Sequence, residues 1–188
     1  MNKVKKLILP ILVILIVLVF TSMNNQSAGT QAIIETNFGT ITADISDKVP
    51  ETYKNFVTLA KQGRYDGVVF HRVIGDFMLQ TGDFENANGT GGHSYKGPGT
   101  TIDEEFHSSL KHSYGALSMA KTALPSTTGS QFFIVQNKSG TAWLDGQHSV
   151  FGMVTEGMDV VEAIAALPTD INDRPLKEAI INKITIVE

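Results

Sequence analysis

The stretch FHRVIGDFMLQTGDF, residues Phe70–Phe84, contributes most to the interpretation of this chain. Side chains alternate along a strand, so Phe70, Arg72 and Ile74 are expected to share one face. An arginine among apolar strand positions is costly unless it is paired or has a chemical role. The next predicted strand carries Gln80, whose amide oxygen can accept a hydrogen bond from a guanidinium group. Taken alone, the pair fits a structural role about as well as a functional one.

Short apolar runs separated by glycine continue along the chain, among them ALSMA, QFFIVQ and VFGMV. Isoleucines on either side of a turn at Asn37–Gly39 predict a hairpin over Gln31–Ile45. A last strand is expected at Ile180–Val187. Many short strands with regular turn signals are typical of an antiparallel barrel or sandwich.

Two helices are expected between these strands. Pro50 beside an acidic residue is typical of a first helical turn, and Gly63 is typical of a helix end. A second helix is expected over Met158–Leu167, because Pro168 cannot continue it. The sequence therefore predicts one mainly β domain with two α-helices.

The composition excludes several classes of protein. Hydrophobic residues make up 42% and charged residues 18% of the 188 residues, as in an ordinary globular protein. The chain has no cysteine, which excludes disulfides, thiolate metal sites and a cysteine nucleophile. Removing Lys3, Lys5 and Lys6 from the 15 basic residues leaves 12 against 19 acidic ones. Such an acidic domain has no electrostatic footprint for nucleic acid.

The N-terminus has the pattern of a targeting segment. A basic opening, MNKVKK, precedes an apolar run over Leu7–Phe20 that suits a signal peptide and is short for a membrane span. A buried core helix is the weaker alternative, because nothing in the run is amphipathic. We expect residues 1–23 to be a signal peptide or N-terminal membrane anchor, residues 24–30 a linker, and residues 31–188 an exported, extracytoplasmic domain.

Familiar catalytic motifs are missing from the sequence. Ser130 lacks the glycines two positions before and after it that define a nucleophile elbow, and the loop Gly89–Gly92 lacks the Gly-Lys-Ser/Thr ending of a phosphate-binding loop. Glycines that adopt positive φ in a turn explain this loop better. The five histidines have no metal-ligand spacing, and His107 and His112 are expected to be structural or solvent-facing. We expect neither a metal nor a cofactor.

Six blocks of the sequence together resemble the cyclophilins, a family of peptidyl-prolyl cis-trans isomerases. The blocks are FHRVIGDFMLQTGDF (Phe70–Phe84), NGTGG (Asn88–Gly92), LSMA (Leu117–Ala120), GSQFFI (Gly129–Ile134), WLDGQHSVFG (Trp143–Gly152) and EGMDVVE (Glu156–Glu162). They occur in the family's order over Gln31–Glu188, and the link after the first helix is similar to that of compact bacterial members. The resemblance implies a closed antiparallel cyclophilin-like β-barrel capped by two α-helices.

The same resemblance implies a set of site residues. Arg72 matches the catalytic arginine and Gln80 its supporting glutamine, while Phe77 and His148 belong to the wall and rim of the proline pocket. The residues implied to contact substrate are Met78, Ala120, Gln131, Phe133, Trp143 and Leu144. Taken alone, most of these would be assigned to a hydrophobic core. The segment Lys121–Thr128 diverges, and nothing is carried over to it.

The resemblance implies catalysis of rotation about Xaa-Pro bonds, and the N-terminal segment adds the expectation that the enzyme assists folding of exported proteins. The implied partners are proline-containing polypeptides, with a cyclosporin-type ligand implied by the family through Trp143. A monomer is the default expectation. The alternative is a non-catalytic module that binds proline-containing segments, but a docking module has no need of Arg72.

Overall fold

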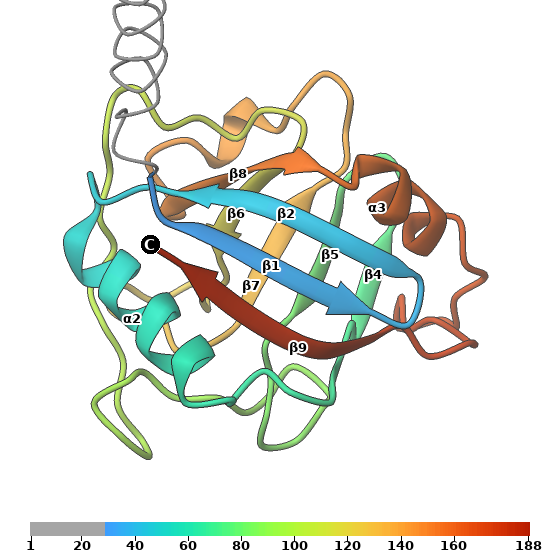
Figure 1. The fold of residues 1–188 in the computed structure, drawn as a ribbon, viewed down its shortest axis with the longest axis horizontal. Helices are drawn as coiled ribbons and strands as arrows, with labels where there is room; N and C mark the ends of the chain where they lie inside the picture. The colour runs from blue at the N-terminus through green and yellow to red at the C-terminus, as the bar shows by residue number, and fades with distance from the viewer. Residues whose placement is uncertain (1–28) are drawn as a thin grey trace, which may run out of the picture.

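A computed structural model describes residues 29–188. The expected signal peptide or anchor over residues 1–23 and most of the expected linker lie outside these residues. The described chain forms one curled antiparallel sheet, with a helix at each of two opposite ends (Figure 1). Among residues 29–188, no helix is both long and apolar enough to cross a bilayer.

The sheet has nine strands, in the order β3-β9-β1-β2-β8-β6-β7-β5-β4. Their bounds are β1 (Gln31–Thr36), β2 (Gly39–Ile45), β3 (Val68–Val69), β4 (Arg72–Ile74), β5 (Met78–Thr81), β6 (Ala116–Met119), β7 (Phe132–Val135), β8 (Val150–Glu156) and β9 (Ile180–Val187). The predicted hairpin is present as β1 and β2, and the predicted last strand is β9.

The sheet is open, whereas the resemblance implied a closed barrel. Its two edges are β3 and β4, which are consecutive in the chain. Phe70 and His71 join them without a turn, so β4 cannot fold back to pair antiparallel with β3. The outer edge of β4 is instead covered by a distant loop, where the Asp173 carbonyl accepts the Val73 N–H at 2.8 Å.

The same interruption changes the direction of one predicted side chain. Phe70 was expected to share the face of Arg72, but it is 2% exposed and lies in the inner core with Val73. Side chains alternate between the two faces only from Arg72 onward, because Phe70 and His71 belong to neither β3 nor β4. Arg72 and Ile74 therefore face outward without Phe70.

The two predicted helices are α2 (Pro50–Lys61) and α3 (Met158–Ala165), the second ending two residues before its expected end. Phe56 of α2 packs against Phe151 and Phe132, with ring centroids 4.9 and 5.4 Å apart. This apolar face closes one end of the curled sheet, and α3 lies at the other end (Figure 1).

Strands β6 and β7 are buried on both faces, and so is β5 except at Gln80. Leu79, Leu117 and Ile134 point into the inner core. Their neighbours point to the outer face, where a second apolar cluster contains Met78, Ala116, Ala120, Phe133, Val135 and Val150. A smaller apolar layer outside the main core therefore lies beside Arg72 on the edge strand β4.

Candidate functional site

A row of paired residues crosses the outer face of the sheet. Arg72 on β4 is opposite Gln80 on β5, Gln80 is opposite Phe133 on β7, and Phe133 is opposite Ser118 on β6. Residues directly opposite one another in an antiparallel sheet point to the same face. The register therefore places the guanidinium group, the amide and the aromatic ring next to one another.

The contacts of Arg72 differ from those expected. Its Nε lies 3.3 Å from Asp173 Oδ2, and the two side chains are 43% and 42% exposed. Gln80 instead donates from Nε2 to the Gln131 Oε1 at 2.8 Å. Among residues 29–188, no hydrogen bond joins Arg72 to Gln80. A carboxylate is the stronger acceptor for a guanidinium, because both partners are charged.

Apolar side chains pack beside this row, at the positions that the resemblance assigns to a pocket. Met78, Phe133 and Ala120 are 2%, 4% and 9% exposed in the outer cluster. Phe77 and Leu144 are partly buried against the same cluster. Together these residues make an apolar surface on the outer face of the sheet, in the strands beside Gln80.

The rim of the pocket is aromatic. Trp143, in the short 3₁₀ turn η1 (Ala142–Leu144), is 59% exposed and stacks on Phe77 with ring centroids 6.1 Å apart. The His148 ring meets Phe133 edge-on at 5.7 Å, and its Nδ1 lies 3.0 Å from the Met119 carbonyl oxygen. Burial lowers the pKa of His148 below the ordinary histidine value, so the ring is neutral at pH 7.

Behind the pocket lies a buried hydrogen-bonded chain that the sequence did not reveal. The His112 ring stacks on Phe133 at 6.0 Å, and its two nitrogens contact Asp145 Oδ1 at 2.8 Å and Ser118 Oγ at 2.9 Å. Burial lowers the pKa of His112, although Asp145 opposes the shift. Ser118 is fully buried and cannot reach a substrate, so this chain supports the pocket wall and is no nucleophilic triad.

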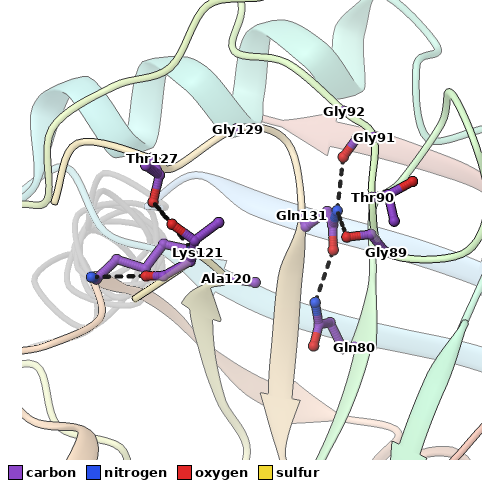
Figure 2. A pocket seen from close by; sticks show the side chains of 11 residues that line it. Gln80, Gly89, Thr90, Gly91, Gly92, Ala120, Lys121, Thr127, Gly129 and Gln131 are labelled. Atoms are coloured by element: carbon purple, nitrogen blue, oxygen red, sulfur yellow. Dashed lines mark hydrogen bonds between the residues drawn. The ribbon is translucent and has the colours of Figure 1, made fainter. Parts of the chain in front are cut away.

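A polar cavity of about 200 Å³ adjoins Gln80. Figure 2 shows Gln131 between Gln80 and the glycine loop, where its Nε2 donates to the carbonyls of Gly89 at 3.0 Å and Gly91 at 2.7 Å. Lys121 and Thr127 also line the cavity, from the segment to which the resemblance assigned nothing. The cavity is a polar groove that runs from the glycine loop to Ala120, at the border of the apolar cluster.

The glycine loop is shaped by Asp83. Burial opposes ionisation of this carboxylate, but N–H groups of Asn86, Gly91, Asn88 and Gly89 outweigh it and lower its pKa to about 2. Gly89 and Gly92 have φ of 88° and 89°, as expected for a turn that requires positive φ. These bonds hold the wall of the groove in one shape.

All ten predicted site residues therefore lie on or beside the outer-face cluster. Asp173 was missed, because it is 101 residues from Arg72 and carries no motif. An apolar pocket, a half-exposed guanidinium group and a row of amide groups suit an extended polypeptide with a compact apolar side chain.

Comparisons with known proteins agree with this geometry. Residues 32–186 match the protein-family model described as "Cyclophilin type peptidyl-prolyl cis-trans isomerase/CLD". A peptidyl-prolyl cis-trans isomerase-like 1 of Neurospora crassa is 46% identical over 160 residues, covering 84% of this chain and 94% of the relative. A putative peptidyl-prolyl cis-trans isomerase of Staphylococcus saprophyticus is 40% identical over 198 residues, covering 90% of this chain and 98% of the relative.

Solved structures are similar as well. A cyclophilin-type peptidyl-prolyl cis-trans isomerase of Cryptosporidium parvum superposes with a TM-score of 0.79 at 33% identity, covering 85% of this chain and 98% of that one. A structure of the same protein in the presence of the dipeptide Ala-Pro superposes with a TM-score of 0.78 at 34% identity, covering 84% and 99% of the two chains.

Proposed function

The chain belongs to the cyclophilin-type peptidyl-prolyl cis-trans isomerases, and we propose that it catalyses rotation about Xaa-Pro bonds through Arg72. The observation that carries this assignment is the row of Arg72, Gln80 and Phe133 across three paired strands. It sets a half-exposed cation beside an apolar pocket.

Rotation about a peptide bond requires loss of its partial double-bond character, against a barrier of about 18–20 kcal/mol. In the twisted state the proline nitrogen regains a lone pair that can accept a hydrogen bond. A guanidinium donor at this nitrogen stabilises the twisted state more than the planar ground state, which is the condition for catalysis. Arg72 suits this role because a guanidinium group presents only N–H donors and no acceptor.

The other site residues bind and orient the substrate. Phe133, Met78 and Leu144 hold the proline ring, since their outer-face cluster is apolar and nearly closed to water. Gln131 and the groove beside it bind the extended backbone that precedes the proline. Holding the ring while the preceding carbonyl rotates supplies orientation to the reaction. No covalent bond breaks, so the reaction needs no nucleophile.

Replacing Arg72 by alanine tests the role of the guanidinium group. Loss of one preorganised donor costs about 2.7–4 kcal/mol, or about 100- to 1000-fold in rate. Arg72 is 43% exposed, so its loss should change the free energy of unfolding by less than about 0.5 kcal/mol. Exchange spectroscopy on an Ala-Pro peptide measures the rate, and urea unfolding measures stability. A folded variant with undiminished turnover would show that Arg72 is not the donor.

The alternative function is a module that binds proline-containing segments without turnover. Exchange spectroscopy of the Ala-Pro peptide with the wild-type chain distinguishes this docking function from catalysis. Binding of the Ala-Pro peptide without faster exchange would favour the docking module, and its peptide partner would then have to be found.

We further propose that the domain is exported and assists folding of extracytoplasmic proteins as a monomer. The support is the basic N-terminus followed by the apolar run Leu7–Phe20. Fractionation of bacterial cells that produce the full chain or a chain without residues 1–28 tests this. The full chain should be found in the membrane or outside the cytoplasm, and the shortened chain in the cytoplasm. Full chain confined to the cytoplasm would contradict export.

A cyclosporin-type ligand is proposed for the same groove. Trp143 supports this, because it is 59% exposed at the pocket rim and offers a flat apolar surface with an indole N–H. Such a ligand should compete with the Ala-Pro peptide, and the substitution Trp143→Ala should weaken it. Simultaneous binding of the ligand and the peptide would contradict a shared site.

A further inference from the structure

Asp173 is the hydrogen-bond partner of Arg72 in the structure. The Arg72 Nε donates to Asp173 Oδ2 at 3.3 Å, across 101 residues of sequence. Among residues 29–188, the guanidinium group makes no other hydrogen bond. Its two terminal nitrogens, Nη1 and Nη2, are therefore left for a ligand.

The loop that carries Asp173 is tightly constrained. Asp170 accepts the backbone N–H groups of Asn172 and Arg174 on Oδ1, at 2.8 and 2.9 Å. Its own N–H donates to the carbonyl of Arg174 at 2.8 Å, and its carbonyl accepts the N–H of Asp173 at 3.1 Å. The loop thus forms a closed turn, with Asp173 in the left-handed region at φ 63°.

The turn is also attached to the catalytic strand. The carbonyl of Asp173 accepts the N–H of Val73, the residue after Arg72, at 2.8 Å. Arg174 Nη1 donates to the carbonyl of Ala87 at 2.8 Å, which ties the loop to the wall of the groove. Asp173 is therefore held on both sides, and its carboxylate has a defined place beside Arg72.

We propose that Asp173 is a positioning residue that orients the Arg72 guanidinium group toward the substrate. The proposal rests on the role assigned to Arg72 under the proposed function. A guanidinium group held at Nε keeps its plane in one orientation, and its terminal nitrogens still have N–H groups that can donate to a ligand. Without this contact the long, half-exposed side chain would sample several rotamers, and only some of them place a donor at the proline nitrogen.

The variants Asp173→Asn and Asp173→Gly test this role. Asparagine and glycine both tolerate positive φ, so the backbone of the turn and its bond to Val73 are expected to persist. Asparagine removes the charge but keeps an acceptor, and glycine removes both. The matched control is Glu178→Gln, which makes the same charge change in the same loop. Glu178 Oε1 lies 3.8 Å from Arg174 Nη2, and no salt bridge within residues 29–188 joins Glu178 to Arg72.

The measurements use the full chain. Exchange spectroscopy on the Ala-Pro peptide should show kcat/KM lowered about three- to fivefold in Asp173→Gly and less in Asp173→Asn, the range typical of a partly exposed ion pair. The Kd of the peptide should be unchanged, because the apolar pocket is intact. In ¹⁵N NMR, the Arg72 Nε–H signal should lose its protection from solvent exchange.

The outcomes separate this inference from the proposed function. An active Arg72→Ala variant would overturn the role of Arg72 and with it the role of Asp173. If Arg72→Ala is inactive but both Asp173 variants behave like Glu178→Gln, only the positioning role of Asp173 is overturned. A weaker Kd at unchanged kcat would overturn it too, because that result indicates damage to the pocket.

Discussion

Replacing Ser118 by alanine should weaken the support behind the proposed proline pocket. The Ser118 Oγ lies 2.9 Å from His112 Nε2, and the two residues are 0% and 2% exposed. Water therefore cannot replace the lost hydroxyl group. A buried polar atom left without a partner costs about 1–3 kcal/mol. We expect the free energy of unfolding to fall by this amount.

Urea unfolding followed by fluorescence measures the change. With an m-value of about 2 kcal/mol/M, the midpoint should fall by about 0.5–1.5 M. Because Ser118 does not contact substrate, kcat/KM for the Ala-Pro peptide should fall by less than about tenfold, through a less rigid Phe133 resting on His112.

The control is Ser108→Ala, the same substitution at an exposed position. It should change the free energy of unfolding by less than about 0.5 kcal/mol. If Ser118→Ala unfolds at the same urea concentration as this control, the hydrogen bond to His112 contributes nothing to stability. The buried chain behind the pocket would then have no structural role.

Two further substitutions separate pocket chemistry from loop stability. The substitution Phe133→Leu conserves apolar burial, so it should lower the free energy of unfolding by less than about 1.5 kcal/mol. It should lower kcat/KM about 10- to 100-fold, because the flat aromatic wall of the pocket is lost. If the variant exchanges the Ala-Pro peptide at the wild-type rate, Phe133 is not part of the pocket. Asp83 has a pKa of about 2, below its ordinary value of 3.8, so its contribution to stability is complete above about pH 4 and is lost as the pH falls toward 2. Asp83→Asn should lower the free energy of unfolding at pH 7 by about 1–2 kcal/mol and flatten its pH dependence, both measured by urea unfolding. A variant that keeps the full wild-type pH dependence would show that Asp83 is not its source.

Much of the fold was predictable because its signals are local. The hairpin over Gln31–Ile45, the helix that begins at Pro50 and the last strand Ile180–Val187 are all present. Turn residues, helix ends and apolar spacing act within a few residues, so they can be read directly from the sequence. The six family blocks then pointed to ten residues that the structure gathers on or beside one face of the sheet.

The open edge of the sheet was not predictable in this way. Alternation placed Phe70 beside Arg72, but the strand is interrupted before Arg72 and Phe70 enters the inner core. The edge at β4 is completed by the carbonyl of Asp173. The curl of the sheet decides which backbone groups of the edge strand meet a distant loop. The spacing of apolar residues in the sequence does not predict these contacts.

The sequence by itself determined most of the elements, the resemblance to the family and the set of residues that the structure gathers on the outer face. Only the tertiary structure decided which side chains hold them in place. Asp173 reaches Arg72 across 101 residues, and Asp145 reaches His112 across 33. Such contacts arise from strand register and from loop paths in three dimensions. An aspartate at either position has no distinguishing pattern until the folded chain brings its partner within hydrogen-bond distance.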